Sequence, residues 1–203
     1  MGGATILCAL FLKPLTVIPL ALWAFSLSFF RDPERTPPEG ETNLVSPADG
    51  KVTDVDEVEA PPFLGGPEAK AIRVGIFLSV FNVHVNRAPV AGIVRHLEHK
   101  DGKYLDARNP ASCRENERQD LGLELPGGCR VMIRQISGAI ARRIVCKAKE
   151  GQGLARGERY GMIKFGSRAE VYAPAGRFQP RVKPGDVVKG GETLIGVMEG
   201  MKE

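Results

Sequence analysis

The chain has 203 residues, enough for one catalytic domain and an appendage, and its 28 Lys and Arg against 24 Asp and Glu give a net charge of only +4. Because the charges are interleaved in sign and form no basic block, the sequence argues against nucleic-acid binding and suits an anionic membrane surface better. The 24 Gly and 15 Pro residues exceed the average combined share of about 12%, which predicts many short strands joined by tight turns.

The cysteines are spread along the chain, at Cys8, Cys113, Cys129 and Cys146. They form no C-x-x-C pair, and no histidine stands at a metal-ligand spacing from them. We therefore expect four reduced thiols and no metal site.

An apolar segment opens the chain at residues 4–30, where Lys13 is the only charge and Pro14 and Pro19 interrupt the pattern. A helix needs about 20 apolar residues to cross a bilayer, so the length suffices, while the prolines favour a kinked span or a shallow re-entrant anchor. A signal peptide, which would carry its positive charge before the apolar run, and a buried core helix are the alternatives. We predict a hydrophobic helical membrane anchor over residues 1–30.

Residues 31–47, RDPERTPPEGETNLVSP, form a proline-rich polar linker, and a catalytic β domain is expected over residues 48–203. Residues 101–128 are interpreted as a long polar loop, which in a compact domain is more often functional than idle. Two segments, LVSPADGKVTDVDEV and RVKPGDVVKGGETLIGVMEG, share a strand-turn-strand layout. Together these features predict a mainly β fold that resembles the barrel-sandwich folds of lipoyl and biotinyl domains.

The segment AIRVGIFLSV has an apolar residue at every even position from Ile72 to Val80. This period of two is typical of a half-buried strand. Polar residues then occupy the even positions, at Asn82, His84 and Asn86. We therefore expect a bulge near Val80, or a core face that opens into a polar pocket.

Ser167 directly follows Gly166 in YGMIKFGSRAEVY. A Gly-Ser pair alone is usually a turn or a bulge. If the backbone is strained and a base is near, however, the hydroxyl can attack the preceding carbonyl and replace the amide by an ester, and a glycine at that position permits the torsions required. β-Elimination would then leave dehydroalanine, which hydrolyses to a pyruvoyl group and ammonia. The pair is a candidate self-cleavage site.

His84 and Asp49 are the candidate partners of this serine. His84 lies among aromatic and β-branched residues, where a structural role is the alternative, and Asp49 in SPADG also fits a simple turn. An Asp-His-Ser set is nevertheless what removal of a serine proton requires, because the acid orients the imidazole and the imidazole accepts the proton.

At these residues the chain resembles the short branch of the phosphatidylserine decarboxylases. The resemblance rests on PADGKV, VFNVHVNRAPVAG, GKYLDA, IRQISGAIARRIVC, GERYGMIKFGSR and VKPGDVVKGGETLIG, in the family's order over about residues 29–197. It implies a pyruvoyl-dependent carboxy-lyase made as a proenzyme and cut into a β chain (1–166) and an α chain (167–203).

The resemblance also implies residue roles. Ser167 would be the cleavage serine and pyruvoyl precursor, and Gly166 would supply the attacked carbonyl. Asp49 matches the aspartate of the PADG motif, and His84 the histidine of the H-x-N-x-x-P segment. The longer branch has two histidines in an H-x-x-H arrangement and Leu-Gly-Ser-Thr at the cut, whereas this chain has one histidine there and Arg168 after the serine. His84 can therefore serve both self-cleavage and later protonation, and the sequence leaves these roles unseparated.

The implied reaction converts phosphatidylserine to phosphatidylethanolamine and CO2 through a Schiff base between the lipid's amine and the pyruvoyl group. The expected partners are phosphatidylserine in the membrane and the two cleaved chains, held together as a heterodimer whose further dimerisation stays open. The expected location is the cell membrane, peripheral or shallowly anchored, with the catalytic domain in the cytoplasm.

Two alternatives belong to other classes. A membrane-anchored barrel-sandwich adaptor or carrier would also combine an apolar N-terminus with a small β domain. A serine hydrolase could use Asp49, His84 and Ser167 directly; it predicts an intact chain, and the G-x-S-x-G elbow is absent. The mass of the purified protein separates these classes.

Overall fold

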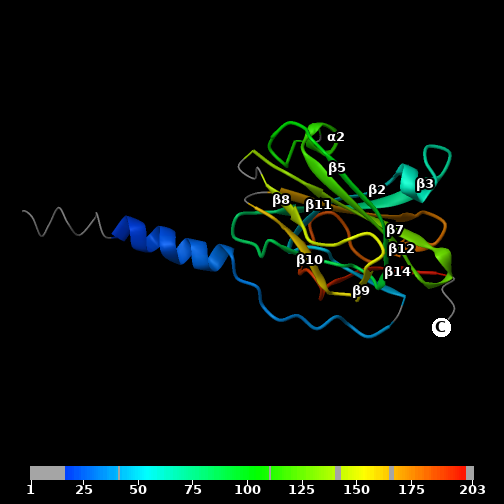
Figure 1. Cartoon of the computed structure of the whole chain (residues 1–203), viewed down its shortest axis with the longest axis horizontal. Helices are drawn as coiled ribbons and strands as arrows, with labels where there is room; N and C mark the ends of the chain where they lie inside the picture. Colours follow the sequence, from blue (N-terminus) through cyan, green and yellow to red (C-terminus); the bar gives the residue numbers. More distant parts are fainter. Residues whose placement is uncertain (1–16, 41, 110, 140–142, 165–166, 200–203) are drawn as a thin grey trace, which may run out of the picture.

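The computed structural model describes residues 17–40, 42–109, 111–139, 143–164 and 167–199. These residues form a β body from which an N-terminal helix projects at one end (Figure 1). The prediction of a mainly β fold is confirmed.

The largest sheet is antiparallel and has eight strands in the order β13-β2-β3-β11-β7-β6-β5-β9. In chain order, its strands are β2 (Gly50–Glu59), β3 (Lys70–Leu78), β5 (Gly92–Lys100), β6 (Arg118–Glu124), β7 (Arg130–Ile136), β9 (Gly153–Leu154), β11 (Ser167–Pro174) and β13 (Val187–Val188). Strand β11 is therefore internal, with hydrogen bonds to β3 on one side and to β7 on the other.

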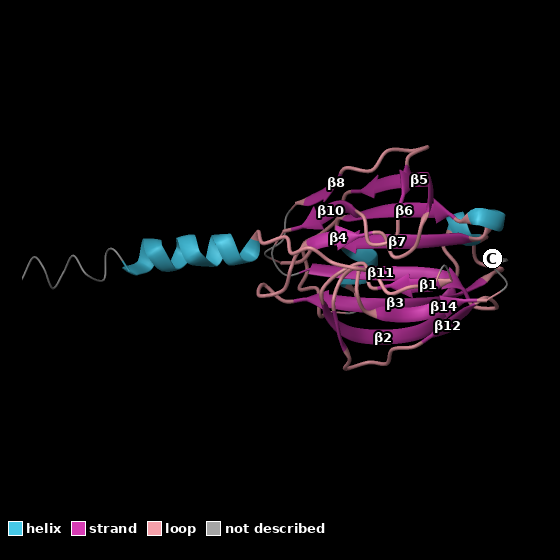
Figure 2. Cartoon of the chain, turned by 90° about the horizontal axis from the view of Figure 1, so that it is seen from below, coloured by secondary structure: helices cyan, strands magenta, loops and turns pink. Residues whose placement is uncertain are grey.

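Two three-stranded sheets complete the body, in the orders β1-β14-β12 and β4-β10-β8. Their strands are β1 (Asn43–Val45), β4 (Val85–Arg87), β8 (Ile144–Cys146), β10 (Arg159–Ile163), β12 (Phe178–Pro180) and β14 (Leu194–Met198), and the short helical turns are η1 (Pro62–Leu64), α2 (Ser112–Glu115) and η2 (Pro126–Gly128). Figure 2 shows the large sheet curled, with β2 and β3 on one side of the body and β5 and β6 on the other. The apolar faces of the strands meet between these sides.

Strand β3 confirms the period-two prediction, because Val74, Ile76 and Leu78 are completely buried. The expected bulge near Val80 is wrong: the strand ends at Leu78 and the chain makes a turn over residues 79–84. The change of parity therefore comes from a new direction of the chain.

The expected loop over residues 101–128 is wrong for its second half, which contains strand β6 and turn η2. Leu121 and Leu123 of β6 are buried in the core. The sequence hides this strand because the charged Asp120 directly precedes Leu121. Its carboxylate is neutralised by Arg134 on β7 at 2.6 Å.

The folded body begins inside the segment 31–47 that we expected to be a linker. Strand β1 lies within it and pairs with β14, and its Leu44 and Val45 are completely buried. The last residues of that segment are thus part of the β body.

The N-terminal helix is described over residues 17–29. Within the described part of the chain, no helix has the length and apolar character needed to cross a membrane. Residues 1–16, which carry the first half of the expected anchor, lie outside the described residues.

Candidate functional site

Ser167 is the first residue of β11, and its backbone pairs with Leu78 at the end of β3. Its side chain is completely buried, and its Oγ has no hydrogen-bond partner among the described residues. A buried hydroxyl without a partner is unfavourable, and such groups often mark chemistry. Gly166, the other half of the expected cleavage site, lies outside the described residues.

His84 is also completely buried, at the end of the 79–84 turn. Its Nδ1 lies 2.9 Å from the carbonyl oxygen of Asn82. Because a carbonyl can only accept, Nδ1 carries the hydrogen and Nε2 keeps its lone pair. In the described part of the chain, that Nε2 has no partner.

The surroundings of His84 keep its imidazole neutral. The ring of Phe29, at the end of the N-terminal helix, packs against it at a tilt of 33° with a centroid distance of 4.1 Å. Burial lowers the pKa of His84 to about 4, the hydrogen bond to Asn82 opposes this change, and the positive charge of Arg31 adds to it. At neutral pH His84 is therefore a base with a free lone pair.

The backbone brings the turn of His84 and the end of β11 together. The amide of Ile163 donates a hydrogen bond to the carbonyl of His84 at 3.3 Å. From Ile163 the chain needs only four residues to reach Ser167, which pairs with Leu78 just before the turn. The Ile163–His84 hydrogen bond and the Ser167–Leu78 pair both join the segment that leads into β11 to the chain around the 79–84 turn. The fold therefore brings His84 and Ser167 to one end of the body.

Further polar side chains are buried next to Ser167. Ser137 lies directly beyond the last β7–β11 pair, opposite Ser167, and is completely buried. Asn86 on β4 accepts a hydrogen bond from Gln135 Nε2 at 2.8 Å. Yet Ser137 Oγ, Asn86 Nδ2 and Gln135 Oε1 have no partners among the residues that the structure describes. The sequence pointed to Asn86, because it continues the polar even positions after Val80, whereas no sequence pattern pointed to Ser137 or Gln135.

Asp49 makes other contacts than those we expected. Its carboxylate accepts hydrogen bonds from Arg35 at 3.1 Å and from the amide of Gly190 at 2.7 Å. Arg35 also pairs with Glu192 at 2.9 Å. The structure therefore brings Asp49 and His84 into no hydrogen bond with each other, and the carbonyl of Asn82 orients the imidazole instead.

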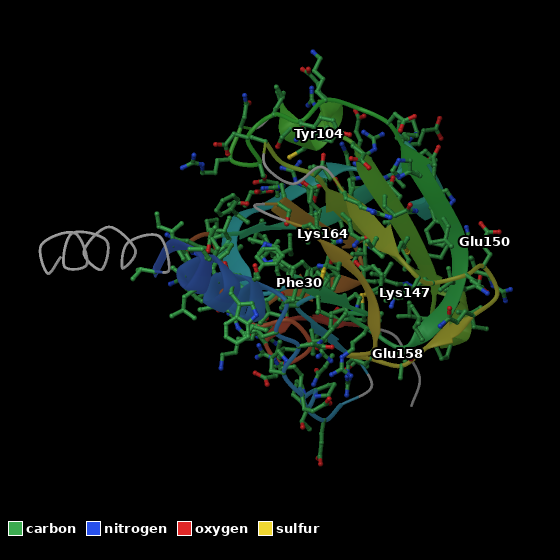
Figure 3. The ribbon with its side chains drawn as sticks, turned by 60° about the vertical axis from the view of Figure 1, so that its left-hand side comes forward. Phe30, Tyr104, Lys147, Glu150, Glu158 and Lys164 are labelled. Atoms are coloured by element: carbon green, nitrogen blue, oxygen red, sulfur yellow. The ribbon has the colours of Figure 1, made fainter. Side chains whose placement is uncertain are left out.

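An apolar surface borders the His84 turn. Phe81, in that turn, is 74% exposed, and its ring meets Phe25 of the helix edge-on at 6.5 Å. The helix also exposes six large apolar side chains, which are Val17, Ile18, Leu20, Leu22, Trp23 and Leu27. Cations lie beside them: Arg31 donates to the carbonyl of Phe81 at 2.7 Å, and Lys164 stands over the ring of Phe30, as Figure 3 shows.

A charged cluster that sequence reasoning missed lies on the opposite face of β11. Arg168 and Glu170 are buried there and form an ion pair at 2.7 Å. A cavity of about 710 Å³ lies beside Arg168, between strands β2 and β3 and the segment around α2. The signal was the alternation of charged and small residues in SRAEVY, which puts every second residue on the same face.

Comparisons with known proteins identify the family of the chain. The family model for phosphatidylserine decarboxylase matches residues 22–196. The chain is 49% identical over 190 residues to the phosphatidylserine decarboxylase proenzyme of Pelobacter propionicus, covering 94% of this chain and 84% of the relative. It is 42% identical over 198 residues to that of Salinibacter ruber (96% and 86%) and 49% identical over 172 residues to that of Symbiobacterium thermophilum (85% and 78%). The chain therefore belongs to the phosphatidylserine decarboxylase family.

Proposed function

We propose that the protein converts phosphatidylserine to phosphatidylethanolamine and CO2, with a pyruvoyl group that it makes from Ser167 by cutting its own chain after Gly166. Family membership supports the reaction. The observation that carries the residue assignment is the pair of unpartnered buried atoms, Ser167 Oγ and His84 Nε2, at one end of the body.

Self-cleavage would begin when His84 Nε2 accepts the proton of the Ser167 hydroxyl. The oxygen attacks the carbonyl of Gly166, and the amide between the two residues is replaced by an ester. Loss of a proton from Cα then breaks the bond between Cβ and the ester oxygen, which releases the β chain as a carboxylate. The dehydroalanine left at residue 167 takes up water and loses ammonia, leaving a ketone.

The residues present fit a pyruvoyl group at this position, because Ser167 is buried with a free hydroxyl and the turn that holds the base His84 begins just after Leu78, the backbone partner of Ser167. Bound to the substrate's amine, such a group accepts the electron pair that the departing CO2 leaves behind. In that step His84 would hold and return a proton close to the substrate's α carbon. Phe29, which packs on the imidazole of His84, would shield that base from water.

The two chains would stay together after the cut. Strand β11, the first strand of the α chain, lies between β3 and β7 of the β chain, and β14 pairs with β1. We propose that Asp49 contributes here as a positioning residue, because it ties Arg35 of the β chain to the turn at Gly190 of the α chain.

We propose a peripheral or shallow attachment to the cell membrane, with the catalytic body on the cytoplasmic side. The exposed apolar face of the helix supports this, since rows of exposed large apolar side chains mark interaction surfaces. Arg31 and Lys164 lie where the helix meets the body and would contact anionic headgroups.

The likeness to barrel-sandwich domains is also a proposal. The two segments with the strand-turn-strand layout pair with each other twice, as β1 with β14 and as β2 with β13. Such mutual pairing of two hairpin-like units supports that comparison.

The test is an assay of the purified protein with vesicles that contain phosphatidylserine. We expect phosphatidylethanolamine and CO2 in equal amounts from a protein that has been cut in two. A serine hydrolase would instead release hydrolysis products from an intact chain, and an adaptor would release neither product.

A further inference from the structure

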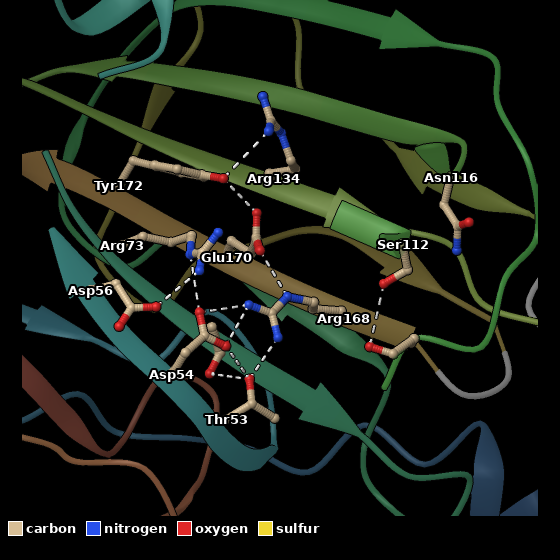
Figure 4. Close-up of polar contacts among 12 residues, drawn as sticks. Thr53, Asp54, Asp56, Arg73, Ser112, Asn116, Arg134, Arg168, Glu170 and Tyr172 are labelled. Carbon is tan, nitrogen blue, oxygen red and sulfur yellow. Dashed lines mark hydrogen bonds and ion pairs between the residues drawn. The ribbon is translucent and has the colours of Figure 1, made fainter. Parts of the chain in front are cut away.

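The charged face of β11 carries a network centred on Arg168 (Figure 4). We call it the Arg168 cluster and define it as Thr53, Asp54, Arg168 and Glu170. Arg168 Nε donates to Glu170 Oε1 at 2.7 Å, and Nη1 donates to Thr53 Oγ1 at 2.6 Å. Its Nη2 binds both carboxylate oxygens of Asp54, at 2.8 and 2.6 Å. All three guanidinium nitrogens therefore have acceptors.

The cluster is also tied to its surroundings. Arg73 on β3 pairs with Asp54 at 3.0 Å, and the hydroxyl of Tyr172 donates to Glu170 Oε2 at 2.6 Å. The Arg168 side chain is only 6% exposed and that of Glu170 is fully buried. Burying such charges requires desolvation, which a buried ion pair often does not repay in net stability. Instead of adding stability, the cluster can hold the side chains and strands that it joins in one geometry, because charge-assisted and bidentate hydrogen bonds are strongly directional.

The position of Arg168 in the chain indicates what is being fixed. It directly follows Ser167, so it would be the second residue of the α chain. A new chain end tends to fray unless it is tied down. The backbone alone holds Ser167 through its pair with Leu78, while the Arg168 side chain reaches across β3 to Thr53 and Asp54 on β2.

We propose that Arg168 is a positioning residue: its bonds to Asp54 and Glu170 hold the end of the α chain in place after self-cleavage, so that the reactive group at residue 167 stays against His84. This inference rests on the proposed function. It assigns a task to the residue at which the chain departs from the family's longer branch.

A matched control lies on the same face of the sheet. Arg134 binds Asp120 with two hydrogen bonds of 2.6 and 2.8 Å, and both side chains are largely buried. This pair joins β6 to β7, and both strands belong to the β chain. Asp54→Asn and Asp120→Asn thus remove the same chemical group from similar pairs. Arg134 also donates to the hydroxyl of Tyr172 on β11 at 3.3 Å, but only Asp54 binds Arg168, the residue next to the new chain end.

The experiment begins with the intact masses of the wild type and both variants, and continues with fully cut protein. Misplacement of a reacting group by about 1 Å can reduce a rate about 10²-fold. We therefore expect kcat to fall between 10- and 100-fold in Asp54→Asn with little change of KM, and to change less than about threefold in Asp120→Asn. Amide exchange at residues 168–171 should accelerate in cut Asp54→Asn, and should not in the same substitution combined with Ser167→Ala, which stays uncut.

Equal kcat in cut Asp54→Asn and wild type would overturn the proposal, and so would equal amide-exchange rates at residues 168–171 in the cut and uncut forms of Asp54→Asn. A folded Asp54→Asn protein that is never cut would also overturn it, since the cluster would then act in cleavage. If Asp54→Asn fails to fold, Thr53→Val provides the same readouts, because Thr53 is exposed and only its hydroxyl is lost. A wild type that stays uncut contradicts the proposed function itself and is seen in the first mass spectrum.

Discussion

The two faces of strand β11 differ in how their buried polar groups are paired. On the core face, Ser167 Oγ has no partner among the described residues, and neither have Ser137 Oγ opposite it and His84 Nε2 in the turn after β3. On the opposite face, every nitrogen of the Arg168 guanidinium and both oxygens of Glu170 are bonded. Buried polar groups normally find partners. We therefore expect the chemistry on the face whose polar groups are unpaired, while the bonds on the other face hold the strand in position.

The largest effect is expected for Ser167→Ala, because the substitution removes the free hydroxyl. The variant should remain one uncut, inactive chain, as seen by intact mass and by the decarboxylase assay. Ser46→Ala is the matched control: Ser46 is equally buried, but its hydroxyl donates to the carbonyl of Ala48 at 2.6 Å. It should be cut normally. A cut Ser167→Ala protein would refute the assignment of the site.

His84→Gln should slow self-cleavage by about 10² to 10⁴, the usual loss when a general base is removed. Proenzyme should accumulate and cut slowly over days, which a time course of intact mass would follow. His96→Gln serves as the control, since His96 is partly exposed on β5 and stacks on Phe63. Equal cleavage rates in both variants would make His84 a structural residue.

The pH dependence sharpens the same point. Because burial lowers the pKa of His84 to about 4, the base stays neutral in mildly acidic solution, and the cleavage rate should remain nearly constant down to about pH 5 and fall tenfold per pH unit below 4. In the unfolded chain, the imidazole of His84 would take up a proton below its ordinary pKa of 6.5, whereas in the folded protein it stays neutral down to about pH 4. The contribution of His84 to the free energy of unfolding therefore decreases as the pH falls from 6.5 towards 4. A rate that already halves near pH 6.5 would show an imidazole open to water.

The smallest effect is expected for Asp49→Asn. Since Asp49 binds Arg35 and Gly190 and not His84, the substitution should lower the free energy of unfolding by about 1 to 3 kcal/mol and change the cleavage rate only a few-fold. Thermal unfolding and the mass time course measure both quantities. A loss of cleavage as large as that of His84→Gln would restore the direct catalytic role that the sequence suggested.

Local patterns in the sequence predicted the parts of the molecule that depend on neighbouring residues. The alternation around Val74 and Ile76 gave β3, and the Gly166–Ser167 pair with His84 gave the candidate chemistry. Strand β6 was missed because its charges are paired only across the sheet, by Arg134. The partner of Asp49 was missed for the same reason, since Arg35 lies in a segment that looked like a free linker.

The mass of the small chain in active protein tests the central claim most directly. We predict two polypeptides, of which the smaller covers residues 167–203 and is lighter by one ammonia than a chain that begins with serine, because its first residue has become a pyruvoyl group. A carbonyl reagent should react with that end. Active protein that contains only the full-length chain, or a small chain that begins with an unmodified serine, would contradict it.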